Sequence, residues 1–175
     1  MGSRHPLMPE SDLSTVHSID VPMVRETLSV IVFLIGNEWL ALPTTVVKEV
    51  ATCRPIHRIP HRRGKEIGGI VNLNGELTPY LALDRLLEIA PESSCEGVVW
   101  RHRQARMVAI VVTGGCWVFS VDEMEGIHHC DPASMKIIPV SSSHLLTGYL
   151  EGVFSIEGKQ VGLLNVERLM MGFQI

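Results

Sequence analysis

The stretch that decides the fold is "GIVNLNGEL" at residues 69–77, where two apolar runs flank Asn74-Gly75. Both central residues of a type I′ turn need positive φ, which Asn and Gly tolerate. Asn-Gly between alternating apolar runs therefore predicts a tight β-hairpin. Pro79 falls inside the second run and predicts an edge position or a bulge there, because proline cannot donate to a strand ladder.

The hairpin stretch occurs twice in the chain. "GIVNLNGELTPYLALDRLL" at 69–87 aligns without gaps with "GVFSIEGKQVGLLNVERLM" at 152–170, so that Gly75 lies opposite Gly158. Each copy reads as strand, glycine-containing turn, strand and short helix. A fixed internal repeat of this length indicates an ancient duplication.

A second pair of segments, 39–53 and 117–130, strengthens the repeat. Each begins with Trp at the start of a short strand, continues into a helical turn with an acidic residue, and ends at Cys. We therefore expect pseudo-repeats over about 28–90 and 104–173. The other short β-branched runs are "LSVIVFLIG", "WLALP", "RMVAIVV" and "CWVFSV", and brief helices are expected at 44–50, 84–89 and 167–171.

Many short strands separated by turn signals are typical of barrels and sandwiches. The predicted fold class is all-β: two small β-barrels with short helices. The repeat alone does not decide whether strands are exchanged between the barrels. Because each barrel alone would be marginally stable, we expect the two to share a packed interface.

The composition of the chain excludes some classes of function. The chain has 175 residues, 46% hydrophobic and 19% charged, so it can bury a core. A net charge of −4 argues against a dedicated nucleic-acid binder. Residues 1–24 lack a secretion signal and read as a flexible tail before a single domain at 25–175, and no apolar run spans a bilayer. We expect a cytoplasmic protein without membrane insertion, whose four cysteines are free thiols.

A search for catalytic or metal-binding groups finds none. "HHC" at 128–130 is the most suggestive cluster, but adjacent strand residues point to opposite faces, and a zinc site needs three or four ligands. Exposed histidines beside a packed Cys are the favoured interpretation. No enzymatic activity, metal or cofactor is expected, and a two-lobed β protein of this kind is most simply an interaction module.

The basic stretch "RPIHRIPHRRGK" at 54–65 holds five of the fifteen basic residues and no acid. Three interpretations compete: a solvated loop, a contact for an acidic protein partner, and a nucleic-acid or phosphate site. The stretch has no aromatic residue to stack on bases, which weakens the last.

The 69–87 stretch resembles the signature of CheW-like chemotaxis coupling proteins, which reads Gly-Val-x-Asn-Leu-Arg-Gly, three residues, Pro and an apolar strand. "LALPTTVVKEV" followed by "PIHRIPHRR" is similar to another family segment, as are "FSVDEMEGI" and "YLEGVFSIEGKQVGLLNVERLM". The likeness runs in order over about residues 28–171. It implies two five-stranded SH3-like barrels and an adaptor between chemoreceptors and a CheA-type histidine kinase, without catalytic activity, in membrane-associated arrays.

The resemblance also implies site residues. The positions that match the family's contact with the kinase regulatory domain are Val47, expected in the first helical turn, and Gly69; a core role for Val47 and a strand bend at Gly69 are the alternatives. The positions that match the family's contact with the helical tip of a receptor lie around the turn and the groove between the barrels. They are Ile59, Pro60, Val71, Leu73 and Asn74. Arg58, Arg62 and Arg63 are candidate electrostatic contacts.

Two positions depart from the family pattern. The family Arg of the turn is Asn74 here, and the Asp of the following strand is Ala82. If the Arg and Asp side chains interact with each other in the family, the absence of both from this chain is internally consistent. These departures suggest a divergent coupling protein, serving control of pili, surface behaviour or a second messenger. A self-assembling β-barrel module without kinase affinity is the alternative from another class.

Overall fold

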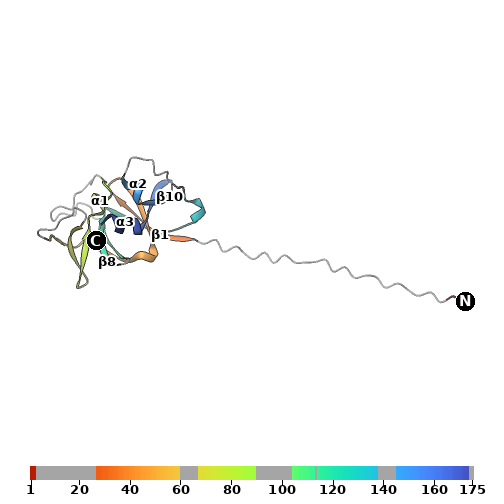
Figure 1. Cartoon of the computed structure of the whole chain (residues 1–175), viewed down its shortest axis with the longest axis horizontal. Coiled ribbons are helices and arrows are strands. Elements are labelled where there is room, and N and C mark those ends of the chain that lie inside the picture. The colour runs from red at the N-terminus through yellow and green to blue at the C-terminus, as the bar shows by residue number, and fades with distance from the viewer. Residues whose placement is uncertain (3–26, 60–66, 90–103, 113, 138–144, 174–175) are drawn as a thin grey trace.

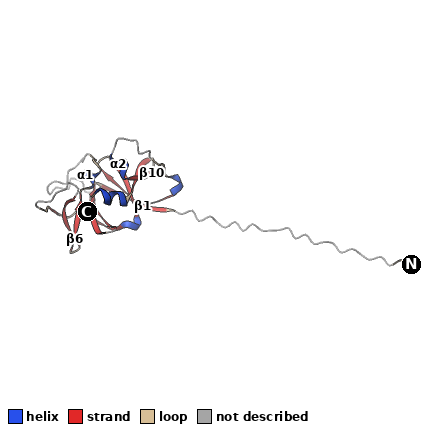
Figure 2. Cartoon of the chain, viewed as in Figure 1, coloured by secondary structure: helices blue, strands red, loops and turns tan. Residues whose placement is uncertain are grey.

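The computed structural model describes residues 1–2, 27–59, 67–89, 104–112, 114–137 and 145–173. Its strands are β1 (Leu28–Ile35), β2 (Glu38–Pro43), β3 (Val47–Thr52), β4 (Ile56–His57), β5 (Ile67–Leu73), β6 (Glu76–Leu81), β7 (Arg106–Val112), β8 (Gly115–Val121), β9 (Glu123–Cys130), β10 (Leu150–Ile156) and β11 (Lys159–Leu164). The helices are short: η1 (Thr44–Val46), α1 (Leu83–Leu86), η2 (Pro132–Ser134), α2 (Leu145–Tyr149) and α3 (Val166–Gly172). The all-β prediction is confirmed, and Figures 1 and 2 show the strands forming the body of the molecule.

The strands form two sheets that each mix the two halves of the chain. One sheet has the order β10-β11-β2-β1-β9 and the other β3-β7-β8-β6-β5-β4. The first hairpin of each half therefore lies beside the last hairpin of the other half, with β11 parallel to β2 and β6 parallel to β8. The third strand of each half also crosses over, since β3 pairs with β7 and β9 pairs with β1. The duplicated halves are thus reciprocally intertwined.

The register of the parallel pairs corrects one detail of the expected repeat. The gapless alignment of the two hairpin stretches matches Tyr80 with Leu163. Tyr80 pairs with Val118, and Leu163 pairs with Ala41, so Ala41 corresponds to Val118. Trp39 and Trp117, aligned above, are therefore one residue out of register.

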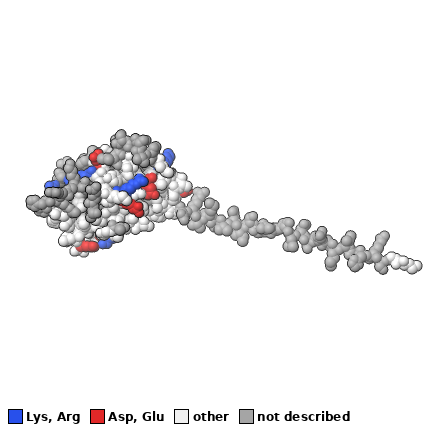
Figure 3. Space-filling view, viewed as in Figure 1, with Lys and Arg blue, Asp and Glu red and all other residues white. Residues whose placement is uncertain are grey.

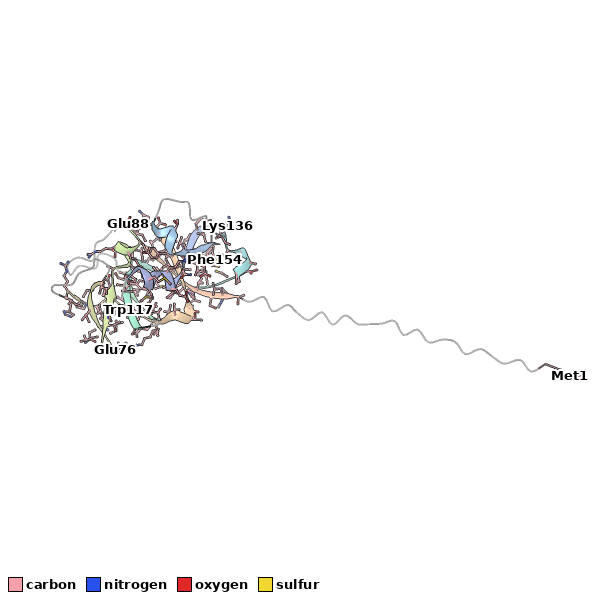
Figure 4. All side chains as sticks on the ribbon, viewed as in Figure 1. Met1, Glu76, Glu88, Trp117, Lys136 and Phe154 are labelled. Atoms are coloured by element: carbon pink, nitrogen blue, oxygen red, sulfur yellow. The ribbon has the colours of Figure 1, made fainter. Side chains whose placement is uncertain are left out.

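A one-residue slip in a strand changes the face on which a side chain lies. Trp39 packs against a cluster inside the first sheet's barrel, whereas Trp117 is buried in the core between the sheets. Figure 4 shows Trp117 within the body. The two tryptophans match in the sequence but occupy different environments.

Two expected helical segments are strands. The helix expected at 44–50 is one turn of η1 followed by strand β3, because Val47–Thr52 is paired along its length with β7. The helical turn expected after Trp117 is likewise strand β9. Of the two alternatives for Pro79, the edge position is wrong, since β6 is an interior strand, and the register shift of its pairing with β5 falls between Ile67 and Gly69 on the partner strand. The missing N–H of Pro79 is tolerated there because β6 pairs with β8 only through Tyr80.

Three apolar clusters stabilise the fold. Each sheet encloses a small cluster, one around Phe154 and one around Tyr80. The largest cluster lies between the sheets and joins residues of both, including Phe33 and Phe119, whose ring centroids are 5.6 Å apart. The main apolar burial is therefore shared by the two barrels, as expected for barrels too small to be stable alone. No helix of the described residues has the length and apolar character needed to cross a membrane.

Candidate protein-docking surface

The turn between β5 and β6 has the predicted backbone. Asn74 has φ of 51° and Gly75 has φ of 92°, as a type I′ turn requires. The Gly75 amide donates to Asn72 Oδ1 at 2.8 Å, and Asn74 Nδ2 donates to Glu49 Oε2 on β3 at 3.0 Å. The turn is therefore fixed both within itself and to a neighbouring strand.

The hairpin has an inner and an outer face. Val71 and Leu73 are 0% and 4% exposed and belong to the small core of the second sheet. Asn72 is exposed on the other face, and Leu77, which is paired with Asn72, is 68% exposed. A partner that docks on this hairpin thus meets the outer face, and Val71 and Leu73 hold that face in place from inside.

Gly69 is buried on β5, next to its antiparallel neighbour β4. Its φ is 155°, and a Cβ at this position would collide with the backbone carbonyl of His57. The register of β5 against β6 shifts between Ile67 and Gly69. The glycine therefore permits a close backbone approach at a strand bend.

Val47 begins strand β3 rather than a helical turn. Its side chain is half-buried and packs against the cluster between the sheets, and its strand partner is Ile110. Val50, on the same strand, is 41% exposed. The position of Val47 is thus compatible with a core role and with a contact at the edge of the second sheet.

The predicted loop residues are described only in part. Arg58 and Ile59 are exposed after β4, and Ile59 is 37% exposed. Pro60, Arg62 and Arg63 lie outside the described residues, as do the expected tail at 1–24, apart from Met1 and Gly2, and Cys95. The other three cysteines are free thiols, as predicted.

The "HHC" segment lies on β9 and forms part of no metal-binding group, since no three His, Cys, Asp or Glu side chains of the described residues converge on one point. His129 is exposed, with Nδ1 2.8 Å from Ser29 Oγ. Cys130 is 8% exposed, and burial raises the pKa of its thiol. His128 is half-buried rather than exposed.

Three outer-face residues were missed by the sequence analysis: Arg54, Asn72 and Leu77. Strand alternation was the available signal, because an apolar Leu77 opposite a polar Asn72 stands on the face away from Val71. Arg54 was noted only as one charge of the basic stretch. The structure places it beside the turn, in a hollow that it shares with Asn72 and Asn74.

The structure thus combines two packed β-barrels with an exposed hairpin whose turn is hydrogen-bonded to β3. The same architecture occurs in the scaffolding protein TtCheW from Thermoanaerobacter tengcongensis, with a TM-score of 0.68 and 21% identity, covering 81% of this chain and 86% of that chain. The fold is thus two SH3-like barrels, as predicted. The model of the CheW-like domain family matches residues 29–172, and the chain belongs to this family. No curated protein sequence matches the chain significantly.

Proposed function

We propose that this chain is a non-enzymatic adaptor that couples chemoreceptors to a CheA-type histidine kinase in the cytoplasm, at membrane-associated receptor arrays. Membership of the CheW-like family supports a chemotaxis scaffold. The observation that carries the proposal is the outer face of the β5–β6 hairpin, which bears the family signature. It presents exposed Leu77 on β6, close to the turn that Asn74 joins to β3. A preformed apolar contact on a rigid hairpin suits the docking of a partner helix.

The kinase contact is proposed at Val47. Gly69 contributes indirectly, by permitting the close backbone approach of β4 to β5. Because Gly69 is buried under the His57 carbonyl, a bulky residue there would disturb the pairing of β4 with β5 before it met a partner. Val47 is the sharper test. Its structural counterpart in the other half is Met124, since Val47 pairs with Ile110 on β7 and Met124 pairs with Phe33 on β1.

A binding titration against the cognate kinase regulatory domain tests this site. Val47→Lys and Met124→Lys place the same charge at corresponding half-buried positions that pack on the same core. We expect Val47→Lys to weaken kinase binding roughly tenfold or more, because an unpaired ammonium is costly in a dry interface. Met124→Lys should retain wild-type affinity. Equal losses in both variants, with equal thermal unfolding, would contradict the assignment.

The receptor contact is proposed on the same barrel, at Ile59, Asn74 and the outer hairpin face. Val71 and Leu73 support this face from the core, and Pro60, Arg62 and Arg63 complete the proposed set. Ile59→Asp should weaken binding to the receptor tip without lowering stability, because the side chain is exposed. Sedimentation of the chain alone examines the self-assembling alternative, which an obligate homo-oligomer without kinase affinity would favour.

A further inference from the structure

A hollow of about 380 Å³ lies between the β3–β4 connection and the β5–β6 turn. Its lining residues are Arg54, Pro55, His57, Asn72, Asn74 and Gly75. Among the described residues the lining contains no carboxylate, although the chain as a whole has a net charge of −4. The hollow is therefore rich in hydrogen-bond donors and locally basic.

The two acids nearest the turn are bound to other side chains and are not part of the lining. Glu49 accepts a hydrogen bond from Asn74 at 3.0 Å, and Glu76 is paired with Lys48 at 3.0 Å. In the described part of the chain Arg54 forms no ion pair or hydrogen bond, and its side chain is exposed. The guanidinium thus keeps all five of its N–H donors for a ligand.

Asn72 adds a donor of fixed direction. Its Oδ1 atom accepts from the Gly75 amide at 2.8 Å, which orients the side-chain amide. The Nδ2 group of the same lining residue has no hydrogen-bond partner among the described residues and is left to donate to a ligand. A planar guanidinium and an oriented amide match the two oxygens of a carboxylate better than a point charge would.

An exposed apolar side chain stands beside these donors. Leu77 is the cross-strand partner of Asn72, so both lie on the outer face with their Cβ atoms about 5 Å apart. On an α-helix, residues three or four positions apart are separated by about the same distance. The outer face therefore offers one polar and one apolar contact at the spacing of neighbouring helix residues.

We propose that this hollow binds a side-chain carboxylate of the receptor helix, while Leu77 packs against an apolar residue three or four positions away on the same helix. The inference rests on the proposed adaptor function and names the chemistry of its receptor contact. Arg54 and Asn72 hold the carboxylate, and the hairpin turn fixes the position of Asn72. The receptor segment is thus an amphipathic helix with an acid at the border of its apolar face.

The test is a double-mutant cycle with the purified full chain and a helical-tip fragment of the cognate receptor. Arg54→Gln removes the guanidinium, and Lys136→Gln removes an exposed charge from the other barrel as a matched control. The receptor fragment is used as wild type and with each acid changed singly to its amide. Circular dichroism checks that every variant is folded.

We expect Arg54→Gln to weaken binding roughly tenfold, the scale of a lost charge-assisted hydrogen bond, and to reduce its dependence on salt. Lys136→Gln should change neither. One receptor acid variant should lose about as much as Arg54→Gln and lose nothing further when the two are combined. Unchanged affinity in Arg54→Gln, or additive losses with every receptor acid, would overturn the proposed hollow while leaving the adaptor function intact. Failure of the wild-type chain to bind the receptor fragment would overturn both.

Discussion

Lys48 Nζ lies 3.0 Å from Glu76 Oε2, and this ion pair has a charge-reversed counterpart in the other barrel. Lys48 is the bulge residue where the register of β3 against β7 shifts, and Glu125 is the corresponding residue of β9. Glu76 aligns with Lys159, whose Nζ atom lies 2.8 Å from Glu125 Oε2. Each half thus has an ion pair between its bulge residue and the residue that follows its hairpin turn. The positive and negative partners are exchanged between the two halves. Figure 3 shows acidic and basic atoms side by side at the lower edge of the body, where Figure 4 labels Glu76.

The two ion pairs should differ in their tolerance of charge exchange. Lys48 and Glu76 have side chains 42% and 62% exposed, so the double reversal Lys48→Glu with Glu76→Lys should restore the stability that Lys48→Glu alone loses. The Glu125 side chain is only 14% exposed, and Lys159 also lies 4.0 Å above the Trp39 ring. The reversal Glu125→Lys with Lys159→Glu should therefore remain destabilised. Urea unfolding of the single and double variants measures this difference, and equal recovery in both pairs would refute it.

The stability of the β5–β6 turn should depend more on the backbone conformation of Asn74 than on the hydrogen bond of its side chain. Asn74→Gly keeps positive φ and removes the exposed bond to Glu49, so we expect a loss of at most about 1 kcal/mol. Asn74→Val places a β-branched residue at φ 51° and should cost about 1–2 kcal/mol more. Glu157→Gly, at φ 49° in the corresponding turn, is the matched control and should be neutral or stabilising. Chemical unfolding curves would decide, and a Val variant as stable as the Gly variant would contradict the turn assignment.

Gly69 should be far less tolerant than a glycine in open space. In Gly69→Ala the new Cβ would meet the rigid His57 carbonyl and the side chain of Ile56, so we expect a loss of roughly 2–3 kcal/mol or more. Gly148→Ala is the control, because nothing lies within 4 Å of its Cβ position and its φ is not positive. Thermal unfolding of both variants provides the measurement. A Gly69→Ala protein as stable as wild type would mean that the β4 backbone does not approach Gly69 as closely as described.

Stability should fall in alkaline solution. Burial raises the pKa of the Cys130 thiol above its ordinary value of 9.0, and burial also raises that of Cys116. The hydrogen bond to Glu76 raises the pKa of Lys48 above 10.5. In each case the folded state binds protons more tightly than the unfolded chain. The stabilisation is complete below the unfolded pKa and is lost as the pH rises through the folded pKa.

The free energy of unfolding should therefore decrease from about pH 8.5 upward, and the slope should be shallower in Cys130→Ala. Urea midpoints at several pH values test this, with the slope compared rather than the absolute stability. Identical slopes in wild type and Cys130→Ala would show that this thiol does not titrate differently in the two states.

Local signals in the sequence predicted local structure well. Asn74-Gly75 specifies its own turn, because the φ requirement is met by two adjacent residues. The strand nature of β3 could not be predicted in the same way, since Val47–Thr52 becomes a strand only by pairing with β7, more than fifty residues later in the chain. The offset of Trp39 and Trp117 likewise appears only in the parallel pairing of distant strands.

The predicted site was likewise correct in its location but not in the orientation of its residues. The family resemblance located the hairpin, but it did not separate inner from outer residues. Val71 and Leu73 were grouped with Asn74 although their parity in the strand places them in the core. Leu77 and Arg54 gain their importance from the folded chain, where the β3–β4 connection lies beside the turn.

The central claim is that this chain joins a receptor to a kinase, and co-sedimentation tests it most directly. Vesicles carrying the cognate receptor are pelleted with the purified kinase, with and without this chain. The adaptor account predicts that the kinase pellets in quantity only when the chain is present, and that Val47→Lys leaves the chain in the pellet but the kinase in solution. Kinase recovery that is unaffected by the chain would contradict the account.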